Sequence, residues 1–144
     1  YYMSEQSFCV KFNLVSGDFE RAGEASSKIK KMLQQIGVSS EIIRRIAIGT
    51  YEGEMNIIIH SNGGEIQAEF YSDYTEITVS DYGPGIADIS LALQEGYSTA
   101  PNYVREMGFG AGMGLPNMKR CADDFNIKSD LGVGTEIKMK FIHK

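Results

Sequence analysis

Hydrophobic and polar residues alternate in five short stretches of the chain, which predicts five strands with one buried face each. In the first stretch Phe8, Val10, Phe12 and Leu14 fall on one side and polar residues on the other. The second and third are separated by a turn at Ser72-Asp73, so they predict a hairpin. The five strands are expected at residues 8–15, 66–70, 77–79, 126–129 and 135–142.

Apolar residues recur every three or four positions in three other stretches, which predicts amphipathic helices. The first helix is expected after a cap at Ser16-Gly17-Asp18 and ends at Gly37, and the second covers about 39–61. The third begins near Leu115 with Pro116 in its first turn, where proline is tolerated. Before it, residues 81–114 allow at most one short helix near 88–94. A loop this long in a compact domain is usually either functional or disordered.

The length and net charge of the chain limit the number of domains and the kinds of ligand that we expect. We expect one domain over residues 1–144, with Tyr1 and Tyr2 as additions before a natural start at Met3. The net charge of −5 gives no basic footprint for nucleic acid or for an anionic membrane. No signal peptide or membrane-length apolar run is present, and Cys9 and Cys121 lack metal or disulfide spacing. These features favour a cytoplasmic protein whose two cysteines are reduced core thiols.

The second predicted helix carries a polar stripe that packing does not explain. Glu52, Asn56 and His60 recur every four residues and therefore share one side of the helix. Gly49 and Gly53 flank the stripe, although each is unfavourable in a helix by about 1 kcal/mol relative to Ala, so we expect close packing there. A carboxylate and an amide oxygen one turn apart can orient a water and ligate Mg²⁺. The alternative is a solvated helix face with an incidental Asn.

The segment Asp81-Tyr82-Gly83-Pro84-Gly85 follows the hairpin directly. Strand alternation places Asp81 on the face of Ile77 and Val79, so its carboxylate is expected to point toward the core side. A buried carboxylate requires hydrogen bonds, and the exocyclic amine of a purine is a suitable donor. Gly83 and Gly85 permit a sharp turn and a close approach to a flat ring. A simple turn at the end of a strand is the alternative.

Alternating glycines lead straight into the third helix in the run Gly108-Phe109-Gly110-Ala111-Gly112-Met113-Gly114. Such a run exposes successive backbone N–H groups, and the start of a helix adds the positive end of its dipole, so we expect phosphate binding. The chain has no G-K-[ST] sequence, and the glycines come too late for a dinucleotide-binding fold. A flexible glycine linker is the alternative.

Thr135 begins the last strand after Gly132-Val133-Gly134. It alternates in phase with Ile137, so its hydroxyl is expected to face inward and to complete the hydrogen bonds around Asp81 through a water. An ordinary threonine at a strand start is the alternative.

In this order and spacing the motifs resemble those of the GHKL ATPase superfamily, which has the Bergerat nucleotide-binding fold. The sequence Glu52-Gly-Glu-Met-Asn56 resembles the N box of that superfamily. Asp81-x-Gly83-x-Gly85 and Gly110-x-Gly112-x-Gly114 resemble its two glycine boxes, and Gly134-Thr135 its terminal threonine motif. The resemblance extends over essentially the whole chain.

Within the superfamily the chain is most similar to the stand-alone serine-protein kinases and anti-sigma factors of bacterial partner switching, above all the switch kinase of the stressosome. The similarity is carried by residues 81–89, 96–99 and 110–116. It implies an α+β fold, a two-layer sandwich. In this fold about three main helices cover one face of a mixed sheet of about five strands, and a long lid closes over ATP.

The resemblance also implies roles for individual residues. Asn56 would ligate Mg²⁺, and Glu52 would act as general base toward an attacking hydroxyl. Asp81 would receive the adenine amine of ATP or ADP. The remaining nucleotide contacts would come from Gly83, Gly85, Ile86, Gly110, Ala111, Gly112, Met113, Gly114, Leu115 and Thr135. Arg105, in the lid, would either face the γ-phosphate or be a solvated loop residue.

The function that the resemblance implies is a serine/threonine kinase that phosphorylates a small STAS-domain antagonist. The alternative is an anti-sigma factor whose ATP site gates the sequestration of a sigma factor or other partner, with little or no kinase activity. A homodimer stays open as the assembly. A detached histidine-kinase domain is disfavoured, because neither His60 nor His143 is suitably placed as a phosphoacceptor.

Two departures from the family pattern affect these expectations. Residues 99–108 make the lid longer than in the switch kinases. Gly53 and Glu54 stand inside the N box, where bulkier or small apolar residues are usual. Glu54 points away from the polar stripe, so we do not expect it to replace Glu52.

Overall fold

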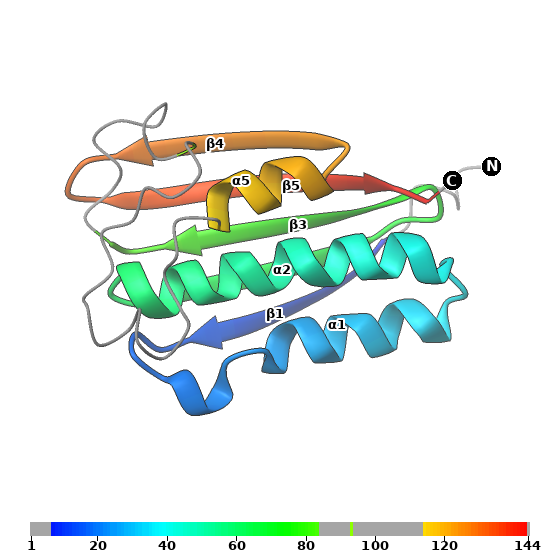
Figure 1. The fold of residues 1–144 in the computed structure, drawn as a ribbon, viewed down its shortest axis with the longest axis horizontal. Coiled ribbons are helices and arrows are strands. Elements are labelled where there is room, and N and C mark those ends of the chain that lie inside the picture. The colour runs from blue at the N-terminus through cyan, green and yellow to red at the C-terminus, as the bar shows by residue number, and fades with distance from the viewer. Residues whose placement is uncertain (1–6, 84–92, 94–113, 144) are drawn as a thin grey trace.

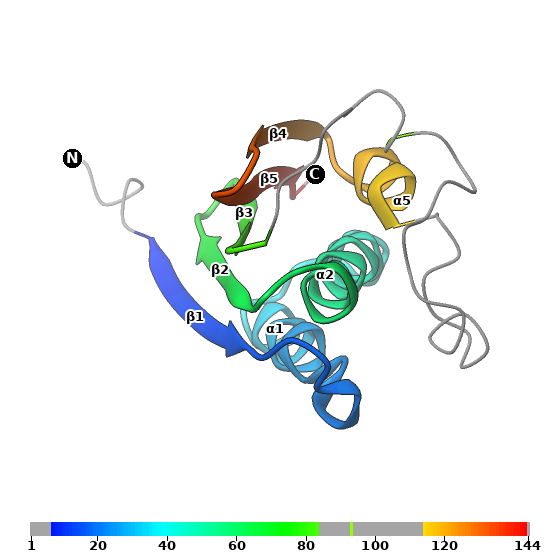
Figure 2. The same cartoon turned by 90° about the vertical axis from the view of Figure 1, so that its left-hand side faces the viewer.

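The computed structural model describes residues 7–83, 93 and 114–143, which form two layers. A curved five-stranded sheet makes one layer, and three α-helices lie on one of its faces (Figures 1 and 2). The elements in chain order are β1 (Phe8–Leu14), a 3-10 turn η2 (Phe19–Arg21), α1 (Glu24–Gln35), α2 (Ser40–His60), β2 (Gly64–Phe70), β3 (Tyr74–Asp81), α5 (Gly114–Cys121), β4 (Asp124–Asp130) and β5 (Gly134–Ile142). The expected α+β sandwich is confirmed.

The sheet is antiparallel throughout, and the expectation of a mixed sheet was wrong. Its strand order is β1-β2-β3-β5-β4, and each of the four neighbouring pairs runs antiparallel. The reason lies in the connection between β1 and β2. A single crossover helix would return the chain for a parallel strand. Here two helices, α1 and α2, cross the sheet in opposite directions, so β2 enters from the end where β1 finishes (Figure 1).

The core lies between the helices and the inner face of the sheet. The alternation predicted for the strands puts every second side chain of β2, β3 and β5 into this layer. Helices α1 and α2 meet them with residues such as Ile29, Leu33 and Ile46, all fully buried. β1 and β4, at the two edges, are only half-buried on this face.

Helix α2 approaches the sheet closely through its two glycines. A Cβ added at Gly53 would lie 2.7 Å from Val79 Cγ2, and one added at Gly49 would lie 3.2 Å from Phe141 Cζ. A larger residue at Gly53 would require Val79 or the helix to shift, and one at Gly49 would require the side chains of Met139 and Phe141 to give way slightly. The expected close packing is therefore confirmed, and its partners are side chains of β3 and β5.

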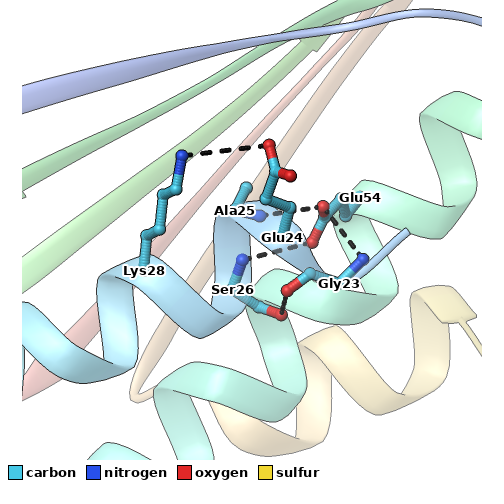
Figure 3. Close-up of polar contacts among 6 residues, drawn as sticks. All are labelled: Gly23, Glu24, Ala25, Ser26, Lys28 and Glu54. Atoms are coloured by element: carbon cyan, nitrogen blue, oxygen red, sulfur yellow. Dashed lines mark hydrogen bonds and ion pairs between the residues drawn. The ribbon is translucent and has the colours of Figure 1, made fainter. Parts of the chain in front are cut away.

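Glu54 ties α2 to the start of α1. Its side chain is fully buried, and its carboxylate accepts hydrogen bonds from the backbone N–H groups of Gly23 (3.1 Å), Ala25 (3.1 Å) and Ser26 (3.2 Å) (Figure 3). These are N–H groups that the first turn of a helix leaves without partners. A carboxylate also interacts favourably with the positive end of the helix dipole. Glu54 thus caps α1 from another helix, and as expected it does not occupy the position of Glu52.

The first helix begins later than predicted. Asp18 makes no side-chain cap and precedes only the short turn η2, whereas α1 starts at Glu24, after Gly23 with φ of 93°. The cap comes from Glu54, about thirty positions away, and local sequence rules cannot anticipate it. The other predicted helices and strands are found within a few residues of their expected bounds.

Two further expectations have clear outcomes. Both cysteines are free, but Cys9 is exposed on the edge strand and is therefore not a core thiol. In the part of the chain that the structure describes, no helix is long and apolar enough to cross a membrane.

We predict that Glu54→Gln lowers the free energy of unfolding by about 1–3 kcal/mol. The NH₂ group of Gln would replace one carboxylate oxygen and face a backbone N–H at the start of α1, so that N–H would lose its acceptor. Urea unfolding measures the change. Glu20→Gln, at an exposed position of the short turn η2, is the control and should stay within about 0.5 kcal/mol of the parent. Equal values for the two variants would contradict the capping role.

The stability that Glu54 contributes should depend on pH. Burial raises the pKa of its carboxyl group above the ordinary value, and the backbone hydrogen bonds from Ala25, Ser26 and Gly23 offset this only in part. The folded protein therefore holds the proton more tightly than the unfolded chain. The part of the stability that depends on this proton is fully present below about pH 4.3, the ordinary pKa of Glu, and is lost as the pH rises through the folded-state pKa, while the hydrogen bonds of the carboxylate to α1 remain. The difference in unfolding free energy between the parent and Glu54→Gln should accordingly be larger at pH 5 than at pH 8.

Candidate functional site

The predicted site residues that the structure describes lie toward one end of the domain. The C-terminal ends of α2 and β3, the β4–β5 turn and the start of α5 all lie there (Figure 1). Glu52, Asn56 and His60 are half-buried along α2, as the four-residue spacing predicts. The buried positions of α2, including Gly49, Gly53 and Met55, face other elements instead.

Asp81, the last residue of β3, is half-buried and in phase with the buried positions Ile77 and Val79, as predicted. Its Oδ1 accepts hydrogen bonds from the backbone N–H groups of Gly83 (2.9 Å) and Thr135 (3.1 Å). Both bonds go to the same oxygen. Within the described residues, the second oxygen, Oδ2, therefore keeps its capacity to accept a bond from a ligand.

Thr135 supports Asp81 in a different way from the one expected. Its backbone N–H binds Asp81 directly, while its hydroxyl lies 2.9 Å from Ser129 Oγ on β4. Thr135 is only 6% exposed, so the inward orientation is confirmed. The water-mediated link through its hydroxyl is not needed, because the hydroxyl pairs with Ser129.

Close backbone approaches hold this corner together. A Cβ added at Gly134, whose φ is 147°, would collide with the backbone oxygen of Asp81. One added at Gly83 would lie 2.9 Å from Ser61 Cβ. Ser61 is itself buried at the end of α2, where its hydroxyl donates to the carbonyl of Ile57 and accepts from the N–H of Gly63. Ser61 was not predicted as a site residue, and its place before the turn Asn62-Gly63-Gly64 is its one local signal in the sequence.

Glu52 contacts the start of α5, the segment that follows the glycine run. Its Oε2 accepts a hydrogen bond from Asn117 Nδ2 at 3.1 Å, and a Cβ added at Gly114 would lie 3.7 Å from its Oε1. Asn117 was not predicted as a site residue. Its position in the first turn after the glycine run is a signal, but no pattern links it to Glu52.

The two halves of the site are separated along α2. From Glu52 to Ser61 there are nine residues, which span about 14 Å at 1.5 Å per residue. Asn56 lies between them, one turn from Glu52. The arrangement therefore offers a carboxylate acceptor near Ser61 at one end, and a carboxylate beside a helix start at the other.

Several predicted site residues lie outside the described part of the chain. They are Gly85, Ile86, Gly110, Ala111, Gly112, Met113 and Arg105, together with most of the short helix expected at 88–94. Of the predicted phosphate cradle, the structure describes Gly114 and Leu115, which begin α5 as expected. In residues 7–83, 93 and 114–143, no three His, Cys, Asp or Glu side chains gather into a metal site.

A family model described as the histidine kinase-like ATPase domain matches residues 15–141, which include every element of the fold except β1 and the last residue of β5. The chain belongs to this family. The predicted resemblance to the GHKL ATPases is therefore confirmed, and membership implies that the chain binds a nucleotide.

Curated relatives of this histidine kinase-like ATPase domain carry two kinds of name. The serine/threonine-protein kinase RsbT of Bacillus subtilis (strain 168) is 31% identical over 140 residues, which are 94% of this chain and 96% of the relative. The anti-sigma F factor of Heyndrickxia coagulans is 36% identical over 104 residues, 72% of this chain and 64% of the relative.

A solved structure confirms the fold. The crystal structure of the RsbU and RsbW domains of Rv1364c from Mycobacterium tuberculosis matches 96% of this chain with a TM-score of 0.61 and 14% sequence identity. The match covers 33% of that larger chain.

The described residues fit a nucleotide and a divalent cation. Asp81 Oδ2 is an acceptor suited to an exocyclic amine, and the amide oxygen of Asn56 is a hard oxygen ligand. Mg²⁺ is usually held by one or two protein oxygens together with substrate phosphates, so Asn56 suffices as the ligand from α2.

We predict that Asp81→Asn weakens the binding of adenine nucleotides at least tenfold while the domain stays folded. The amide oxygen of Asn keeps both bonds that Oδ1 accepts now, but Oδ2 is replaced by a donor that repels the amine. Calorimetric titration with ADP measures affinity, and thermal unfolding without ligand measures stability. Unchanged affinity would remove Asp81 from the binding site.

Proposed function

We propose that this histidine kinase-like ATPase domain is an ATP-dependent protein serine/threonine kinase. The observation that carries the proposal is the contact of Glu52 with the start of α5. This contact places a carboxylate beside the end of the glycine run, one helical turn from Asn56. The kinase named among its relatives, similar over 94% of this chain, supports transfer to a serine or threonine hydroxyl.

The orientation of ATP follows from the two ends of α2. Adenine lies at Asp81, where Oδ2, which accepts no bond from the described residues, accepts its amine, and the phosphates extend along α2 toward Gly114. The N-terminus of α5 faces the phosphates, so its backbone N–H groups and dipole stabilise their charge. Asn56 would hold Mg²⁺, which would supply further neutralisation of the phosphate charge.

Glu52 acts as the general base in this proposal. The hydroxyl oxygen of the acceptor forms a bond to the γ-phosphorus, and the hydroxyl proton passes to Glu52. The bond between the γ-phosphorus and the bridging oxygen breaks, and ADP leaves. Because phosphoryl transfer depends mainly on positioning and charge neutralisation, one base and a few amides are enough.

The acceptor that we propose is a small STAS-domain antagonist in a partner-switching pathway. The alternative function is that of an anti-sigma factor, in which the same nucleotide site gates the binding of a sigma factor or another partner. The anti-sigma F factors among the relatives support this alternative. The two functions differ in one measurement, the transfer of phosphate to an acceptor.

We predict that Glu52→Gln lowers the rate constant for phosphoryl transfer by about 10²–10⁴-fold, the usual contribution of a general base. ATP affinity should change less than about threefold, because the amide oxygen still accepts a bond from Asn117. The assay uses labelled ATP and candidate STAS proteins, with detection of phosphoserine and phosphothreonine. Glu65→Gln, on β2 and outside the site, is the control. If the parent protein labels no acceptor but binds a sigma factor tightly when nucleotide is present, the alternative function is correct.

We predict that Asn56→Ala abolishes the Mg²⁺-dependent part of ATP binding. Thermal stabilisation by ATP is measured with Mg²⁺ and with a chelator, because a ligand that binds only the folded state raises the melting temperature. The parent should respond more strongly with Mg²⁺, whereas the variant should respond equally in both. Retention of the Mg²⁺ response would assign the cation to other ligands.

A further inference from the structure

We propose that Asn117 positions Glu52 for phosphoryl transfer, by holding one oxygen of its carboxylate so that the other faces the transferred phosphate. This inference rests on the kinase function proposed above. Asn117 Nδ2 donates to Glu52 Oε2 at 3.1 Å, across 65 positions of sequence. Both side chains are partly buried, which shields the bond from competition by water.

The orientation of the Asn117 amide is set by a second bond. Arg120 Nη1 donates to Asn117 Oδ1 at 2.8 Å, so the amide oxygen faces the guanidinium group and the amide nitrogen faces Glu52. With the amide reversed, its NH₂ group would meet a cation, and its oxygen would meet a carboxylate. Asn117 therefore presents a donor to Glu52 rather than an acceptor.

The helix that carries Asn117 is fixed against α2 at its other end too. Arg45 of α2 donates from Nε and Nη2 to the carbonyl oxygen of Cys121, at 3.0 and 2.8 Å, and its Nη2 pairs with Asp123 at 3.0 Å. Met118, between the two ends, is fully buried in the core. Because α5 is held at both ends and in the middle, Asn117 sits at a defined distance from Glu52.

The two carboxylate oxygens of Glu52 then have separate roles. Oε2 is held by Asn117, whereas Oε1 is the oxygen nearest Gly114, at the end of the glycine run. Oε1 is the oxygen that accepts the proton from the attacking hydroxyl. A misplacement of a reacting group by about 1 Å can lower a rate about 10²-fold. Loss of the single hydrogen bond from Asn117 to Glu52 is therefore expected to lower the rate of phosphoryl transfer measurably.

The test compares Asn117→Leu and Asn117→Asp, with Lys119→Leu on the exposed side of the same helix as control. Leu has a similar size and no donor, so transfer should fall about tenfold. Asp is nearly isosteric but places a second carboxylate against Glu52, so transfer should fall further. ATP affinity should change less than about threefold in both, because the positioning acts on the transfer step.

Asn117→Asp also separates positioning from structure. An acidic residue in the first turn of a helix interacts favourably with the dipole, which offsets the repulsion from Glu52, so this variant should unfold within a few degrees of the parent. A purely structural Asn117 would lose stability in Asn117→Leu and keep the parental transfer rate in that variant. Parental transfer rates in both variants would therefore overturn the proposal.

The contact between Asn117 and Glu52 can also be tested by NMR spectroscopy, which does not depend on kinase activity. The side-chain amide signal of Asn117, assigned by its loss in Asn117→Leu, should shift in Glu52→Ala and stay unchanged in Lys119→Leu. An unshifted signal in Glu52→Ala would overturn the proposal. If the parent transfers no phosphate to any acceptor, the proposed function fails and the positioning role with it. The amide signal then still shows whether Asn117 holds Glu52.

Discussion

The packing of one helix against the sheet determines where everything else in this domain can lie. Helix α2 comes so close to β3 and β5 that an added Cβ would overlap Val79 at Gly53 and press on Met139 and Phe141 at Gly49. That close approach fixes the rotation of α2 about its own axis. One face is pressed on the sheet, a second carries Glu54 toward α1, and a third leaves Glu52, Asn56 and His60 half-buried along the site.

Glu54 shows how a buried charge can serve architecture. Removing a carboxylate from water is unfavourable unless hydrogen bonds replace the lost hydration. Three backbone N–H groups at the start of α1 provide those bonds, and the helix start needs an acceptor there in return. The buried carboxylate and the unpaired N–H groups of α1 thus supply each other's hydrogen bonds, so α1 and α2 are joined by polar contacts as well as by their apolar faces.

The site is assembled from segments that only the fold brings together. Asp81 is held by the backbone of Gly83 and of Thr135, while Glu52 is held by Asn117. Among the described residues, both cases use one oxygen of a carboxylate for structure, and in the proposed function the other oxygen meets the ligand. The same device at the two ends of α2 suits a ligand with an amine at one end and phosphates at the other.

The sequence by itself determined the elements, the two-layer class and most of the family's motif residues. Alternation and helical spacing are local properties, and they placed Asp81 on the inner face and Glu52 and Asn56 on one side of α2. Tertiary structure alone decided the antiparallel sheet, the cap from Glu54, the backbone bond of Thr135 and the contact of Asn117 with Glu52. These depend on partners 28 to 65 positions apart, which meet only when the helices pack on the sheet. Periodicity reports which face a side chain occupies, and packing decides which atom it meets there.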